Sequence, residues 1–119
     1  MNTCISYRYR DASNYKAFGS IVVKGRVQFS DIEPFLVDGE YFIPQLVGME
    51  GLQEALFAHG GPNQDDHVFH EITEGDFEPT ASVPTTDISA KNLVKMFREA
   101  HAKKWPERET MEALGIPEN

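Results

Sequence analysis

The residues with the clearest potential for chemistry lie in one short segment near the middle of the chain. Two carboxylates, two imidazoles and a third carboxylate fall within seven residues there: Asp65, Asp66, His67, His70 and Glu71. Such side chains are the usual ligands of Zn²⁺, Mn²⁺ or Fe²⁺ and the usual groups for acid–base catalysis. The segment is therefore a candidate site, and its most specific form is a metal ion held by His67, His70 and Asp65.

The spacing of the two histidines restricts what this segment can do. Residues 67–73 have the composition of a strand, and the side chains of a strand point alternately to opposite faces. The two expected faces carry His67, Phe69 and Glu71 on one side and Val68, His70 and Ile72 on the other. One metal held by both histidines would then require a bulge or a helix. The alternative is structural: the aspartates cap a turn, His70 is buried and hydrogen-bonded, and Glu71 is solvated.

A second candidate lies near the N-terminus, where basic and aromatic residues alternate between Tyr7 and Lys16. Arg8, Arg10 and Lys16 could contact an anion, because guanidinium groups bind phosphate bidentately and aromatic faces accept bases. The alternative, which the acidic composition favours, is a cross-strand ladder in which the arginines pair with acidic neighbours. If Asp65 or Glu71 lies close to Arg8 or Lys16, the two candidates form one site.

Length and composition indicate one globular domain over residues 1–119. The chain has 40% hydrophobic and 25% charged residues, which is ordinary for a folded protein and unlike a disordered one. Its formal net charge of -8 favours solubility and disfavours non-specific binding to nucleic acid or to an anionic membrane. We therefore expect neither nucleic acid nor a membrane as a partner.

Charge is distributed unevenly along the chain. Residues 1–26 and 91–105 each carry a net charge of +4, whereas residues 27–90 contain thirteen Asp and Glu and no Lys or Arg. We expect the two basic segments to lie beside the acidic middle and to neutralise it.

Cysteine usage and the N-terminus indicate a cytoplasmic protein. Cys4 is the only cysteine, so an intrachain disulfide cannot form. The first residues lack the basic and apolar regions of a secretory signal. The longest apolar runs are far shorter than the roughly 20 residues of a membrane-spanning helix.

Hydrophobic periodicity and turn signals predict the elements that would position these residues. Strands are expected over 5–10 and 17–29, joined as a hairpin around 11–16, with an edge segment over 40–47 and a strand over 67–73. Helices are expected from a capping box at Ser30 to a stop at Gly39, over 50–58, over 89–105 and over 107–114, and residues 74–86 form a connection. The order predicts an α+β fold, a small antiparallel sheet covered on one side by helices.

Three segments resemble those of a group of short bacterial proteins that carries no assigned activity. They are the start from Tyr7 to Lys16, the run from Phe42 to Gly48, and the run from Asp65 to Glu71. The similarity spans most of residues 5–80. It implies a bacterial, cytoplasmic protein and brings no cofactor or catalytic residue with it.

Two functions remain open from the sequence. The first is a non-enzymatic protein-interaction module without a cofactor, which would use the acidic middle, or the aromatic arm 41–44, to dock a protein partner; one variant is an acidic surface that imitates nucleic acid. The second is a small metal-dependent hydrolase of the phosphodiester type. It would use Zn²⁺ or Mn²⁺ at the 65–71 segment and Arg8, Arg10 or Lys16 to clamp the substrate. A homodimer through an edge strand is compatible with either.

Overall fold

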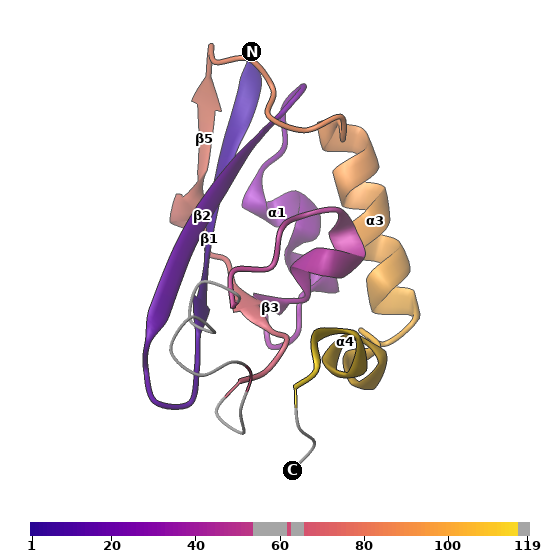
Figure 1. The fold of residues 1–119 in the computed structure, drawn as a ribbon. Helices are drawn as coiled ribbons and strands as arrows, with labels where there is room; N and C mark the ends of the chain where they lie inside the picture. Colours follow the sequence, from indigo (N-terminus) through magenta and orange to yellow (C-terminus); the bar gives the residue numbers. More distant parts are fainter. Residues whose placement is uncertain (54–61, 63–65, 117–119) are drawn as a thin grey trace.

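A sheet and a layer of helices make up the computed structural model of this chain (Figure 1). The structure describes residues 1–53, 62 and 66–116. Within these residues, five strands form an antiparallel sheet, and α1 and α3 lie on one side of it. The predicted α+β class, a small antiparallel sheet covered on one side by helices, is confirmed.

The described elements have the following bounds. The strands are β1 (Asn2–Arg10), β2 (Lys16–Val23), β3 (Tyr41–Phe42), β4 (His70–Glu71) and β5 (Phe77–Thr80). The helices are α1 (Phe29–Ile32), α3 (Ala90–Ala102) and α4 (Glu107–Leu114), with 3₁₀ turns over Glu33–Phe35, Pro44–Val47 and Glu74–Asp76.

Strand β1 is the centre of the sheet. It pairs with β2 along its whole length, from Thr3 opposite Val23 to Arg10 opposite Lys16. Its other edge pairs with β5 near the N-terminus and with β4 at Arg8, and β3 follows β4. The first strand of the chain thus brings the 67–71 segment beside the basic N-terminal residues.

The alternation predicted for β1 is confirmed. Ile5, Tyr7 and Tyr9 face the helices and are buried, whereas Arg8 and Arg10 face the opposite side of the sheet. We call that opposite side, which no described helix covers, the outer face. The predicted hairpin is confirmed as well, and its turn is closed by the carboxylate of Asp11, which accepts the backbone N–H of Tyr15 at 2.9 Å.

Helix α1 begins earlier and is shorter than predicted. Its capping box uses Gln28 and Asp31 in place of Ser30 and Glu33. The chain continues as a 3₁₀ turn through Pro34, and Gly39 does not end a helix. Gly39 has a positive φ of 73° in the turn that joins Val37 to Tyr41.

The segment predicted as an exposed aromatic arm belongs to the core. Phe42 and Ile43 are 0% exposed, and Pro44 is buried as the start of a 3₁₀ turn. Only Tyr41, whose side chain is on the outer face beside Glu71, is partly exposed. The prediction of an exposed docking arm here is wrong, because Phe42 packs against Tyr7 of β1 and Phe97 of α3. The predicted edge segment is confirmed in part, since β3 is the last strand in the order β2-β1-β4-β3.

The other strand predictions differ in extent. The expected strand 67–73 is reduced to β4, and the expected connection 74–86 contains β5, which pairs with β1 from Ile5 to Asn2. The expected helix 50–58 lies mostly outside the described residues.

Helix α3 covers the sheet with a stripe of apolar side chains. Its side chains Leu93, Phe97 and Ala100 are buried, and Ser89 caps it by accepting the N–H of Asn92 at 3.2 Å. The helix ends at Ala102 and not at 105. Its last turn is closed instead by Trp105, whose φ is positive and whose indole N–H donates to the carbonyl of Phe35 at 2.8 Å.

Helix α4 has the predicted bounds. None of the helices in the described part of the chain has the length and apolar character needed to cross a membrane.

Candidate functional site

The two faces predicted for residues 67–72 are present, although only His70 and Glu71 form regular strand. His67, Phe69 and Glu71 line a cavity of about 430 Å³ on the outer face, together with Arg10, Val37, Asp38 and Tyr41. Val68, His70 and Ile72 are completely buried on the other side of the same segment. The two histidines therefore belong to different faces of the segment, and both rings pack against that of Tyr9, at 5.0 and 5.1 Å.

His70 is a neutral core residue. Its Nε2 accepts the backbone N–H of Leu52 at 2.9 Å, so the ring proton is on Nδ1, which donates to the carbonyl of Val68 at 3.1 Å. Burial lowers the pKa of the imidazole to about 4, because desolvation disfavours the charged form. Both ring nitrogens are thus committed to the backbone, as the structural interpretation of this residue predicted.

His67 is committed to the backbone in a similar way. Its Nδ1 accepts the N–H of Phe69 at 3.1 Å, so Nε2 carries the proton and donates to the carbonyl of Arg10 at 2.6 Å. The ring lies 5.0 Å from that of Tyr9. His67 therefore ties the 67–71 segment to the end of β1.

Asp66 is buried and hydrogen-bonded, and does not cap an exposed turn. Its Oδ1 accepts the hydroxyl of Tyr9 at 2.8 Å, and the same hydroxyl accepts the N–H of His67 at 3.1 Å. Burial raises the pKa of the Tyr9 hydroxyl, so it remains a donor over the whole physiological range. Asp65, the third predicted ligand, lies outside the described residues.

Glu71 joins the two candidate sites. Its Oε1 lies 3.1 Å from Nε of Arg8 and 3.4 Å from a terminal nitrogen of Arg10. Arg8 also lies 3.5 Å from a carboxylate oxygen of Asp76. The predicted cross-strand ladder is therefore confirmed for the two arginines. Lys16 is opposite Arg10 on the outer face and has no ion pair within the described residues.

The contacts of His67, His70 and Asp66 hold residues 66–71 in place on the fold, and they favour this structural role over catalysis. A metal ion requires lone pairs, and the ring nitrogens of both histidines are already used by backbone hydrogen bonds. Residues 1–53, 62 and 66–116 hold no cluster of three or more His, Cys, Asp or Glu with metal-binding geometry. The metal site of His67, His70 and Asp65 stays a prediction without support from these contacts.

We expect titration with Zn²⁺ or Mn²⁺ to give no stoichiometric, micromolar binding, because a metal at the unprotonated ring nitrogen of either histidine would have to displace the backbone N–H of Leu52 or of Phe69. Isothermal calorimetry on the wild type, His67→Ala and His70→Ala measures this directly. Micromolar binding that is lost in both variants would contradict it and would restore the metal-dependent hydrolase.

Sequence reasoning missed Phe18, one of two exposed aromatic residues of the β1–β2 hairpin; the other, Tyr15, lies in the candidate segment between Tyr7 and Lys16. Phe18, in β2, is 71% exposed, and Tyr15, in the turn, is 68% exposed. Phe18 is opposite Arg8 and so belongs to the outer face. The signal that could have found it is the period-two pattern, which places Phe18 in register with the polar Lys16 and Ser20.

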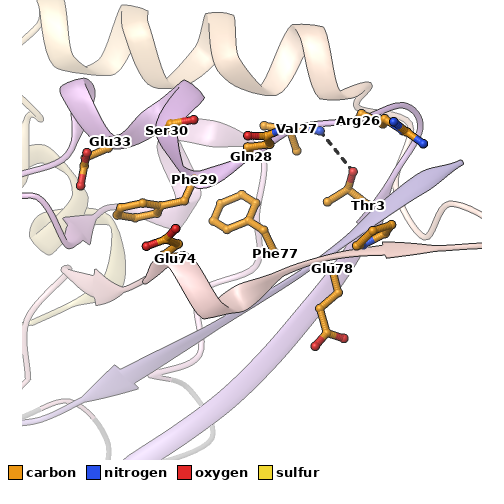
Figure 2. A pocket seen from close by; sticks show the side chains of 11 residues that line it. Thr3, Arg26, Val27, Gln28, Phe29, Ser30, Glu33, Glu74, Phe77 and Glu78 are labelled. Carbon is orange, nitrogen blue, oxygen red and sulfur yellow. Dashed lines mark hydrogen bonds between the residues drawn. The ribbon is translucent and has the colours of Figure 1, made fainter.

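A further cavity, of about 490 Å³, lies between α1 and β5 (Figure 2). Phe29 and Phe77 form its apolar part in an edge-to-face contact at 6.0 Å, and Glu33 and Glu74 lie beside Phe29 at one end. At the other end Thr3 accepts the N–H of Val27 at 3.2 Å (Figure 2). None of the predicted site residues lines this cavity.

The chain matches no protein-family model, no curated protein and no solved structure. The resemblance to short bacterial proteins stays a prediction.

Proposed function

We propose that this chain is a non-enzymatic protein-interaction module that binds its partner through the outer face of the β1–β2 hairpin. We call this surface the hairpin surface and define it by Arg8, Arg10, Tyr15, Lys16 and Phe18. The observation that carries the proposal is Phe18, a phenylalanine with 71% of its surface exposed in the middle of a strand and flanked by cations.

The composition of the hairpin surface is that of a binding surface. Exposed aromatic rings and arginine are enriched where proteins bind one another, and they account for much of the binding energy. Phe18 borders a hollow of about 380 Å³ lined also by Arg8, Ser20 and Asp76. A side chain of a partner could enter this hollow beside the ring without moving the backbone.

The charge of the hairpin surface selects an acidic partner. The whole chain is at -8, yet Arg10 and Lys16 are directly opposite each other here. Glu71 is shared between Arg8 and Arg10, which leaves the Lys16 end of the surface positive. The lone Cys4 supports a reducing, cytoplasmic compartment as the place where this partner is met.

The contacts of the described residues favour the protein-interaction module over the metal-dependent hydrolase. Its two histidines are on opposite sides of one segment, and the arginines that would clamp a substrate are paired with Glu71 and Asp76. No other observation on the described residues favours a reaction.

Photo-crosslinking in cells of the source organism tests the proposal. A benzophenone amino acid placed at position 18 is expected to form a crosslink to a specific protein. The same group at position 83 is the matched control, since Val83 is 78% exposed and belongs to the connection between β5 and α3, outside the hairpin. Equal crosslinks at both positions, or none at position 18, would overturn the proposal.

Affinity capture with variants gives an independent measurement. We expect Phe18→Ala to reduce recovery of the crosslinked protein by about tenfold or more, because a buried aromatic anchor contributes about 2 kcal/mol or more to binding. Val83→Ala should leave recovery unchanged. Undiminished recovery with Phe18→Ala would show that the partner binds elsewhere.

A further inference from the structure

We infer that the partner binds as an added β-strand on the free edge of β2, along residues 16–20, with an acidic side chain opposite Lys16. This inference rests on the proposed function and deepens it, because it specifies the conformation and the charge of the bound segment. The occupant is an extended acidic segment of another protein that also carries an apolar side chain to contact Phe18.

The pairing pattern defines which backbone groups face outward from β2. The N–H of Val22 donates to the side chain of Thr85 at 2.9 Å, and its carbonyl accepts the N–H of Thr85 at 2.9 Å. Val22 therefore directs both groups away from β1. Because strands alternate, Lys16, Phe18 and Ser20 direct their N–H and C=O groups to the same edge.

Other residues of the chain already form hydrogen bonds with this edge at Val22 and Lys24. Besides the two bonds of Thr85, the N–H of Ala90 donates to the carbonyl of Lys24 at 2.8 Å, in a parallel bridge between Lys24 and Ser89. No described residue pairs with residues 16–20 of the edge. An added strand over residues 16–20 would continue the pairing that Thr85 and Ala90 begin. It would satisfy up to six backbone groups, the N–H and C=O of Lys16, Phe18 and Ser20.

The outer-face side chains define the chemistry of the added strand. Lys16 and Arg10 are like charges directly opposite each other, and of the two only Arg10 has a carboxylate beside it among the described residues, so a further anion beside Lys16 would relieve the remaining repulsion. Two residues further along β2, Phe18 presents its ring to the next side chain on the same face. The segment that fits therefore has an acidic and an apolar residue two positions apart.

Lys16 also argues against a second copy of the chain as the occupant. A lysine on an exposed edge disfavours pairing with an identical edge, which would add more positive charge, and permits pairing with an acidic strand. Strand β2 itself contains no carboxylate.

Nuclear magnetic resonance with a synthetic peptide tests the inference on the whole chain. The probe is the blocked peptide Thr-Glu-Thr-Phe-Thr-Glu-Thr, which is symmetric and so reads the same in parallel or antiparallel pairing. We expect the amides of Phe18 and Ser20 to be unprotected from exchange in the free chain and to shift and become protected with the peptide. The amide of Val22, already bonded to Thr85, should change little. The same peptide with lysine in place of glutamate should bind about tenfold more weakly or worse.

Protection of the Phe18 and Ser20 amides before peptide is added would overturn the inference, as would peptide-induced shifts confined to other elements. Shifts that depend on the concentration of the chain alone would assign the edge to a second copy instead. No shift at millimolar peptide would also count against it.

A pair of variants separates strand addition from the proposed function. Ser20→Pro removes an edge N–H that does not bond to β1, and Ser20→Ala keeps it. The comparison requires that the two variants have equal melting temperatures. We then expect Ser20→Pro, but not Ser20→Ala, to weaken both peptide binding and capture of the crosslinked partner about tenfold. If Ser20→Pro binds as the wild type does while Phe18→Ala does not, strand addition is wrong and the hairpin surface stands. If both bind as the wild type does, the proposed function fails as well.

Discussion

Phe42→Ala is expected to lower the free energy of unfolding by about 3–5 kcal/mol, the usual cost of truncating a large aromatic side chain in a packed core. Phe42 is 0% exposed, and its ring lies 5.5 Å from that of Phe97 and 5.8 Å from that of Tyr7. It thereby joins the inner face of the sheet to α3, so the cavity left by alanine would open between the two layers.

Urea denaturation followed by circular dichroism measures this loss. Tyr41→Ala is the matched control, because Tyr41 is the adjacent residue of the same strand but faces outward and is only partly buried. We expect it to cost less than about 1 kcal/mol. Similar losses for the two variants, both small, would contradict the placement of Phe42 in the core and would make residues 41–44 available again as a docking arm.

Periodicity predicted the elements whose side chains alternate between two clear environments. Ile5, Tyr7 and Tyr9 define the buried face of β1, and Leu93 and Phe97 define that of α3, so the burial of these elements followed from residue type alone. The bounds of α4 followed from Pro106 before it and Gly115 after it.

The elements that could not be predicted depend on contacts between distant residues. Strand β5 contains Pro79, and its two exposed residues are Glu78 and Pro79. It is a strand only because the edge of β1 opposite β2 lies beside it. Helix α3 ends three residues early because Trp105 turns back to bond with the carbonyl of Phe35. Local propensity carries no information about either contact.

The candidate site likewise has features that could be predicted from the sequence and features that could not. The alternation of faces around His70 was readable from the sequence, and it correctly separated His67 from His70. The backbone groups that fix the tautomer of each ring were not readable, since Leu52 is 18 residues from His70 and Arg10 is 57 residues from His67. Those partners tie both histidines to the backbone of the fold.

Ion pairing on the outer face is the reason why we place the proposed partner-binding end of the hairpin surface at Lys16. Arg8 contacts both Glu71 and Asp76, so its charge is compensated within the chain. Arg10 shares Glu71 at the longer distance of 3.4 Å and keeps 44% of its side chain exposed. Positive charge therefore increases from Arg8 through Arg10 to Lys16, toward the free edge of β2.

The stability of the chain is expected to fall as the pH is lowered from about 6.5 to about 4, through His70. Its pKa is about 4 in the folded chain against 6.5 for a free histidine, chiefly because of burial. Between these values the unfolded state binds the proton and the folded state does not, so the free energy of unfolding rises with pH across this window. The contribution is complete above the unfolded pKa and amounts to about 3 kcal/mol.

Carboxylates titrate in part of the same range, so the measurement is the difference between the wild type and His70→Gln. Urea unfolding at about pH 7.5 and about pH 4.5 should show His70→Gln to be less stable at the higher pH, because Leu52 and Val68 lose matched partners, and to lose less stability on acidification than the wild type. An unchanged slope in His70→Gln would mean that His70 binds its proton equally readily in the folded and the unfolded chain. That result would contradict the burial of the ring and its acceptance of the N–H of Leu52.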